Sequence, residues 1–200
     1  SGPDMFADLV IFKISAAPSM SLMPIYTGSS ETGMTGTYIG YGLDRGADVP
    51  GQGWLWGTTP TKRWGQNVID GTFTVSDGAS QTYYESLVSD FDRVGGPFGT
   101  GLANESHAAT GDSGGALFVK EGSIWKLAGI MTAVTDTGHS FYDNNPSLPG
   151  NQQPDELFSV RLSDYNGWIL ATIPEPETST LAVLGAAALL VRILRRRPRL

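Results

Sequence analysis

Gly111-Asp112-Ser113-Gly114-Gly115, followed at once by Ala116-Leu117-Phe118-Val119, is the stretch that decides how this chain is interpreted. The pattern predicts a glycine-rich turn that leads into a buried strand. Glycines let successive backbone N–H groups point into one concavity without a side chain in the way. Such a concavity can stabilise an oxyanion beside a serine hydroxyl, so Ser113 is a candidate nucleophile. The alternative is a serine in a purely structural glycine turn.

A second feature lies near the start of the chain, where Asp8 precedes the apolar run Leu9-Val10-Ile11-Phe12-Lys13-Ile14. A nucleophilic serine needs a base to take its proton and a carboxylate to orient that base. Asp8 is the candidate carboxylate. The alternative is an aspartate that only caps a turn before a strand.

Taken together, these stretches resemble the chymotrypsin-like (trypsin-like) serine proteases. Three further stretches occur in the order of that family. Tyr38-Ile39-Gly40-Tyr41-Gly42 takes the place of a Gly-Trp-Gly strand, and Leu127-Ala128-Gly129-Ile130-Met131 resembles the strand after the nucleophile. Residues 158–169 resemble the last strand and the closing helix. The resemblance covers residues 1–172, which correspond to roughly the last two thirds of such a domain.

The resemblance implies an all-β fold, the chymotrypsin-like double β-barrel, with the second barrel and the last strand of the first barrel in this chain. The 26 glycines and 12 prolines, with many short β-forming runs, also favour a sandwich or barrel over a helix bundle. The last strand of the first barrel is expected over residues 5–15 and a closing helix over 164–173. The six strands of the second barrel are expected near residues 37–42, 67–75, 83–89, 115–120, 124–134 and 157–162.

The resemblance also implies roles for the candidate residues. Ser113 would attack the scissile carbonyl of a protein or peptide substrate, and the amides of Gly111 and Ser113 would form the oxyanion hole. Asp8 would orient the catalytic histidine. In this family the carboxylate before the nucleophile, here Asp112, can pair with a new N-terminal amine. The implied activity is that of a serine-type endopeptidase.

The catalytic histidine of the family precedes the aspartate, whereas the two histidines of this chain, His107 and His139, follow Asp8. We therefore expect the chain to be a fragment of a longer precursor that holds the histidine upstream. On this view the parent protein is active and the 200-residue piece is inactive.

The specificity pocket is expected around His107, which lies six residues before the nucleophile, at the position that forms the base of the pocket in the family. With His107 and the neighbouring Ala108 there, in place of an aspartate, we expect no trypsin-type cleavage. Thr132, Ala133 and Val134 would form the wall, with Val134 narrowing the pocket. The alternative for His107 is an ordinary surface histidine.

Other ligands are not expected. His107 and His139 have no third ligand at a recognisable spacing, so the sequence predicts no metal site and no cofactor. The net charge is −7, and the residues before Pro174 carry eighteen acidic and eight basic side chains, so nucleic acid is not an expected partner. The chain has no cysteine, so it forms no disulfide.

The C-terminal part, residues 173–200, carries a separate signal. Pro174-Glu175-Pro176-Glu177 is followed by an apolar segment, 178–194, just long enough to span a bilayer, and by an arginine-rich end. This order resembles the PEP-CTERM sorting signal of Gram-negative bacteria. It implies an exported protein that is held in the inner membrane by this helix, processed by an exosortase-like enzyme, and delivered to the cell surface or the medium. The alternative is a plain membrane anchor.

Two non-catalytic interpretations stay open. One is a protease-like domain that binds peptides without cleaving them. The other is a surface or matrix protein whose protease-like domain serves adhesion.

Overall fold

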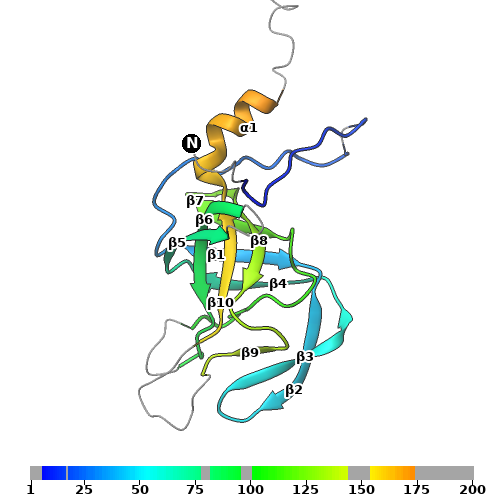
Figure 1. Cartoon of the computed structure of the whole chain (residues 1–200), viewed down its shortest axis with the longest axis vertical. Helices are drawn as coiled ribbons and strands as arrows, with labels where there is room; N and C mark the ends of the chain where they lie inside the picture. The colour runs from blue at the N-terminus through cyan, green and yellow to red at the C-terminus, as the bar shows by residue number, and fades with distance from the viewer. Residues whose placement is uncertain (1–5, 17, 78–81, 96–100, 144–153, 174–200) are drawn as a thin grey trace, which may run out of the picture. The chain divides into compact units, whose positions relative to one another are not determined.

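The computed structural model describes residues 6–16, 18–77, 82–95, 101–143 and 154–173. The chain divides into two compact units, Ser1–Asn166 and Gly167–Leu200. In the described part of the first unit, the regular secondary structure is almost entirely β-strand (Figure 1). The prediction of a mainly β fold is confirmed.

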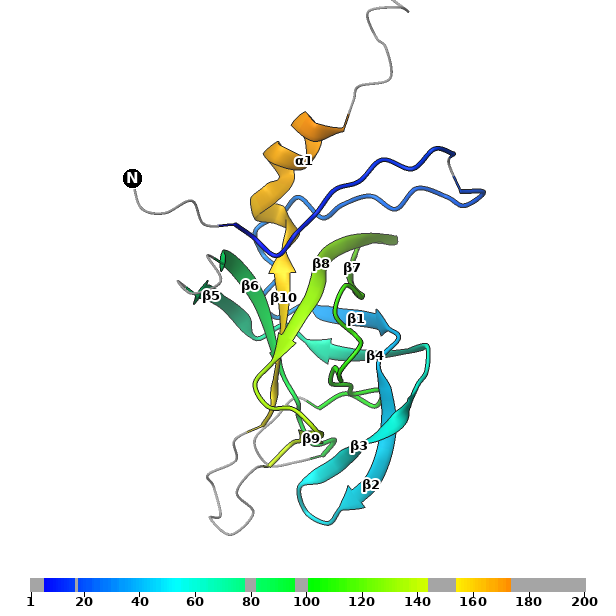
Figure 2. The same ribbon diagram turned by 45° about the vertical axis from the view of Figure 1, so that its right-hand side comes forward.

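The larger sheet has seven antiparallel strands in the order β4-β1-β7-β8-β10-β6-β5. Figure 2 shows these strands from the side on which β8 lies in front. Their bounds are β1 Thr35–Gly40, β4 Arg63–Val68, β5 Gly71–Asp77, β6 Thr82–Asp90, β7 Ala116–Glu121, β8 Ile124–Val134 and β10 Glu156–Arg161. A second sheet of three antiparallel strands has the order β2 (Leu43–Val49), β3 (Gly53–Pro60), β9 (His139–Phe141).

The core packs against the larger sheet, and in β1 and β7 alternate residues are buried in it. In β7, Leu117 and Val119 are fully buried while Lys120 and Glu121 at the end of the strand are exposed. Tyr38 of β1 joins this core, and its hydroxyl group is paired with Ser89 of β6 at 2.7 Å. The alternating sequence of β7 thus decides which of its faces is buried.

The expectation of a closed barrel is corrected by the sheet order. Strands β4 and β5 lie at opposite ends of the larger sheet and do not pair with each other in the described residues, so the sheet is open. The single strand expected over 67–75 is two strands, because the chain changes partner at Ile69-Asp70. The N–H of Ile69 donates to Met34, beside β1, and the N–H of Asp70 donates to Val88 in β6.

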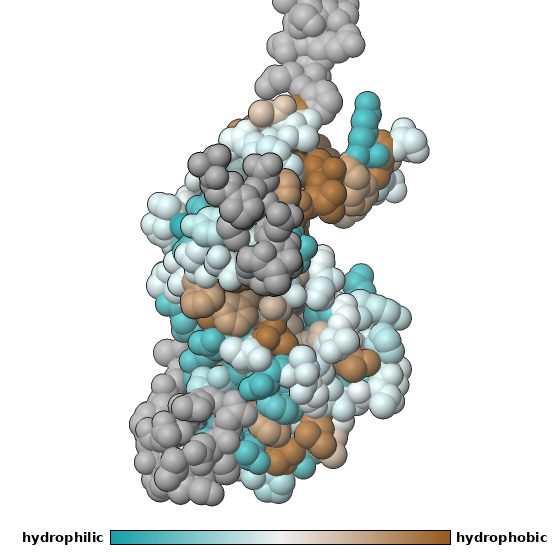
Figure 3. Space-filling view, viewed as in Figure 1, coloured by the Kyte–Doolittle hydropathy of each residue, from teal (hydrophilic) through white to brown (hydrophobic). Residues whose placement is uncertain are grey.

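The segment expected as the last strand of the first barrel, residues 5–15, forms no strand in its described part. Its only ladder contact is an isolated bridge between Phe6 and Thr82. Because no strand of the described residues pairs with this run, several of its apolar side chains are exposed, namely those of Val10, Phe12 and Ile14. Figure 3 shows apolar surface at the upper right, where Figure 1 places this segment.

An ion pair joins the segment before β1 to the end of β10. Arg161 donates two hydrogen bonds to the buried carboxylate of Glu31, at 3.1 and 2.8 Å, and the hydroxyl of Ser163 donates a third at 2.6 Å. Burial raises the pKa of Glu31, but these hydrogen bonds outweigh it, so the pKa lies below its ordinary value. Glu31 is therefore ionised and fully paired.

A 3-10 helix, Leu162–Tyr165, and the helix α1, Asn166–Thr172, follow β10. They confirm the closing helix that was expected over 164–173. Within the part of the chain that the structure describes, no helix has the length and apolar character needed to cross a membrane. The segment 174–177 and the expected membrane span, 178–194, lie outside the described residues.

Candidate active site

The glycine-rich loop 111–115 is held between strands β1, β7 and β8. The N–H of Gly114 donates to the carbonyl of Met131 at 2.9 Å, and the N–H of Met131 donates to Gly115 at 2.8 Å. Gly111 has a φ of +97°, a conformation that side chains other than that of glycine rarely adopt. The loop therefore has one defined conformation against β8.

The loop presents Ser113 to solvent. Its hydroxyl donates to the carbonyl of Thr132 at 3.3 Å, a long and weak hydrogen bond that a stronger base could replace. Among the described residues, neither the N–H of Gly111 nor that of Ser113 has a hydrogen-bond acceptor. The two amides expected to form an oxyanion hole are thus free for a ligand.

Asp112 anchors the loop from behind. Its carboxylate accepts the N–H of Gly42 at 2.6 Å and the N–H of Ala109 at 2.9 Å. A Cβ atom on Gly40 or Gly42 would lie 2.1 to 2.8 Å from this carboxylate, so both positions must be glycine for Asp112 to approach. The side chain of Asp112 is therefore directed toward Gly40 and Gly42.

Beside Ser113 lies a cavity of about 280 Å³, which we name the Ser113 cavity. The structure brings most of the sequence-predicted site residues together around it. These residues are Ala108, Gly111, Ser113, Thr132, Ala133 and Val134. Because residues from the loop and from β8 meet here, a bound chain could contact the serine hydroxyl and the free amides together.

Two of the sequence-predicted residues do not line this cavity. Asp8 is exposed in the N-terminal segment, and no hydrogen bond or ion pair joins it to Ser113 in the described structure. His107 lies instead at a second cavity, of about 170 Å³, together with Trp54, Trp56 and Asp112. The role of Asp8 stays a prediction, and His107 is not at the base of the Ser113 cavity.

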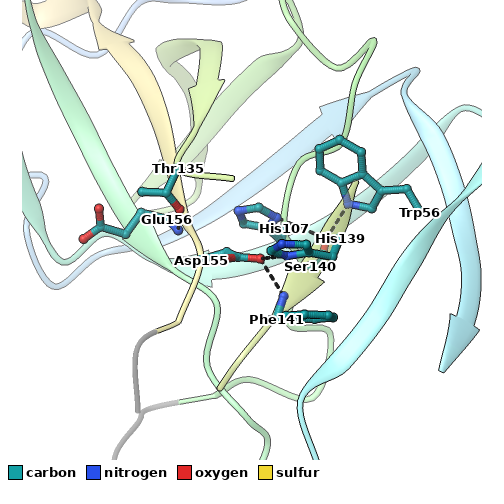
Figure 4. A network of polar contacts seen from close by, with 8 residues as sticks. All are labelled: Trp56, His107, Thr135, His139, Ser140, Phe141, Asp155 and Glu156. Carbon is teal, nitrogen blue, oxygen red and sulfur yellow. Dashed lines mark hydrogen bonds and ion pairs between the residues drawn. The ribbon is translucent and has the colours of Figure 1, made fainter. Parts of the chain in front are cut away.

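Figure 4 shows the polar network that holds His107. Its Nδ1 lies 3.1 Å from the hydroxyl oxygen of Ser140, which also accepts the indole N–H of Trp56 at 2.9 Å. Burial lowers the pKa of His107, so its imidazole is neutral at pH 7. This histidine links the segment before the loop 111–115 to the smaller sheet, and no contact joins it to Ser113 in the described residues.

The second histidine, His139, belongs to the same region (Figure 4). Its Nδ1 lies 2.9 Å from the buried carboxylate of Asp155, which also accepts the N–H of Phe141 at 2.7 Å. No group of three or more histidine, cysteine, aspartate or glutamate side chains is suitably placed for a metal ion within the described residues.

Sequence reasoning missed the role of Gly40 and Gly42. The signal was present, because two glycines flanking one aromatic residue in a strand indicate close approach by another backbone or side chain. The partner, Asp112, lies 70 residues further along the chain than Gly42. Only the folded structure shows that Asp112 lies against Gly40 and Gly42.

A comparison with protein-family models and with curated proteins found no match for this chain.

Proposed function

We propose that this chain carries the nucleophile and the substrate-binding surface of a serine endopeptidase. The observation that carries the proposal is the loop 111–115, where an exposed serine hydroxyl, two free amides and an adjoining cavity come together. A peptide carbonyl placed between Ser113 and these amides would have its developing oxyanion stabilised, at about 2.7 to 4 kcal/mol for a donor of this kind. The open seven-stranded sheet is the proposed counterpart of the second barrel of the chymotrypsin-like fold.

The reaction would follow the acyl-enzyme route. The Ser113 oxygen attacks the carbonyl carbon, its proton passes to a general base, and the base returns that proton to the leaving amine. Water then hydrolyses the ester. No histidine contacts Ser113 in the described residues, so a histidine outside them would act as the base, with Asp8 as its orienting carboxylate.

We also propose a function for the C-terminal tail. The segment 173–200 would act as the membrane-held sorting signal of an exported enzyme, cut near Pro176 by an exosortase-like protein. Mass spectrometry of the extracellular protein from its native host tests this, since recovery of the intact arginine-rich end would leave only a plain anchor.

A fluorophosphonate probe tests the proposed chemistry, because it reacts with activated serines. The full-length protein should be labelled on Ser113, and Ser113→Ala should abolish labelling and reduce peptide hydrolysis by several orders of magnitude. Ser140→Ala is the matched control, since Ser140 also lies beside a histidine but is buried. Labelling on Ser140, or none, would overturn the proposal.

The second candidate function is non-catalytic peptide binding. The observation that favours it is that, among the described residues, no base contacts the Ser113 hydroxyl, which donates to Thr132 instead. Peptide binding that persists in the full-length protein without labelling or turnover would support this second candidate.

A further inference from the structure

We propose that the Ser113 cavity receives an uncharged, apolar side chain of the substrate, the one that precedes the bond attacked by Ser113. This inference rests on the proposed function and adds the substrate class. It also assigns specificity to Val134 and Leu157 in place of His107.

The inner part of the cavity is apolar. Ala108, Met131 and Leu157 all line it and are buried, with 7%, 3% and 1% of their surfaces exposed. Val134 is paired with Leu157 in the register of β8 and β10, so the two side chains come from directly opposed positions. An apolar side chain that enters the cavity would move from water into contact with aliphatic groups, which is a favourable transfer.

Thr132 is the polar residue of the wall 132–134, and its hydroxyl group is already hydrogen-bonded within the protein. Thr132 donates its hydroxyl to the carbonyl of Phe158 at 3.3 Å and accepts the hydroxyl of Tyr84 at 3.1 Å. It therefore has little capacity left for a polar substrate group.

The charge of the cavity lining also favours an uncharged substrate side chain. Asp112 is the one ionisable residue among those that line the cavity. Its two carboxylate oxygens accept the N–H groups of Gly42 and Ala109 and lie toward Gly40 and Gly42. A charged side chain of either sign would therefore lose water in the cavity without gaining an ion pair, so lysine, arginine, aspartate and glutamate are disfavoured.

His107, which was expected at the base of the pocket, lies at the second cavity instead. His107 is committed to Ser140 in the second cavity, which leaves Ala108 and Leu157 to form the inner surface. The volume of about 280 Å³ exceeds the roughly 150 Å³ of an apolar protein cavity that holds benzene. Leucine, methionine and phenylalanine side chains therefore fit.

The test uses N-acetylated tripeptides that end in leucine, arginine or glutamate, as product-like ligands for the isotopically labelled chain in NMR titrations. The leucine peptide should shift the amide signals of residues 132–134 and of Ala108. It should bind at least about tenfold more tightly than the other two, a difference of about 1.4 kcal/mol. Equal binding of all three, tighter arginine binding, or no binding of the leucine peptide would overturn the inference.

Variants make the test specific. Val134→Asp places a carboxylate in the wall and should reverse the preference toward the arginine peptide. Ile124→Asp is the matched control, because it makes the same charge change at the exposed far end of β8 and should leave the preference unchanged. Should Val134→Asp fail to fold, Ala133→Asp adds the charge at an exposed position that also lines the cavity.

Hydrolysis by the full-length protein separates this inference from the proposed function. Ser113-dependent cleavage after arginine would overturn the inference and leave the protease proposal intact. Selective binding of the leucine peptide without any Ser113-dependent cleavage would support the inference and contradict the protease proposal.

Discussion

At the scale of single residues, the approach of Asp112 to Gly40 and Gly42 restricts which residues can stand at positions 40 and 42. The carboxylate fills the space where a side chain would stand on either glycine. This is a packing constraint between two parts of the chain that are distant in sequence. It explains why both positions hold the smallest residue.

Gly42→Ala should therefore displace Asp112, because the new Cβ atom would lie 2.5 Å from its carboxylate. The hydrogen bond from the Gly42 N–H would be lost, and we expect destabilisation of about 1 to 3 kcal/mol in urea unfolding. Labelling of Ser113 in the full-length protein should also fall. Gly71→Ala is the control, since no atom lies within 4 Å of its added Cβ. Equal effects of the two substitutions would contradict this explanation.

At the scale of elements, the ion pair between Glu31 and Arg161 holds the segment before β1 to the end of β10. Arg161→Met should destabilise the chain by about 3 to 5 kcal/mol, because it leaves a buried carboxylate without its partner. Arg45→Met removes the exposed pair of Arg45 with Asp48, whose side chains are 55% and 69% exposed, and should cost about 0 to 1 kcal/mol. Urea unfolding of both variants checks the difference. A cost for Arg161→Met as small as that for Arg45→Met would show that water already reaches Glu31.

Elements also show how far the sequence leads. The strand over 124–134 could be predicted, because its apolar pattern is long and bounded by turn residues. The short closing helix was predicted from the resemblance that covers residues 158–169. Strands β2 and β3 could not, because Gly46, Gly51 and Gly53 interrupt the pattern and β-bulges break its period of two. The run 9–14 has the composition of a strand, but no neighbouring strand pairs with it.

The candidate site shows the same division. The loop 111–115 and the wall residues Thr132, Ala133 and Val134 could be placed from their order in the sequence, and they do meet around one cavity. The orientation of His107 could not be foreseen. Its partner Ser140 belongs to β9, a strand of the smaller sheet that the sequence pattern did not indicate.

At the scale of the whole molecule, four carboxyl groups lie close together near the end of β6. They belong to Asp70, Asp90, Asp92 and Glu105. Burial, together with the charges of Asp70 and Asp92, raises the pKa of Asp90 to about 7. Burial raises the pKa of Glu105 to about 8, with the charges of Asp92 and Asp90 adding to the rise. The Glu105 carboxyl accepts backbone N–H groups, from Leu102 at 2.8 Å and from Asp92 at 3.3 Å.

Stability should therefore fall as the pH rises. In the unfolded chain these carboxyls ionise near pH 4, whereas in the folded chain they hold their protons up to about pH 7 and 8. The loss begins above about pH 4 and is complete above about pH 8. Urea midpoints measured across this range should decline, and Glu105→Gln should flatten the upper part of the decline.

Asp136→Asn is the matched control for this pH dependence, since it removes one exposed carboxylate and should leave the slope unchanged. A stability that rises with pH over the same range would show that the acidic group is solvated in the folded chain.

The loop 111–115 contains both bonded and free amides, and this has a consequence for hydrogen exchange. The N–H groups of Asp112 and Gly114 donate to Ala109 and Met131, whereas those of Gly111 and Ser113 have no acceptor in the described part of the chain. Deuterium should therefore enter the loop quickly at 111 and 113 and slowly at 112, 114 and 115. A ligand that occupies the two free amides would slow exchange at those positions alone.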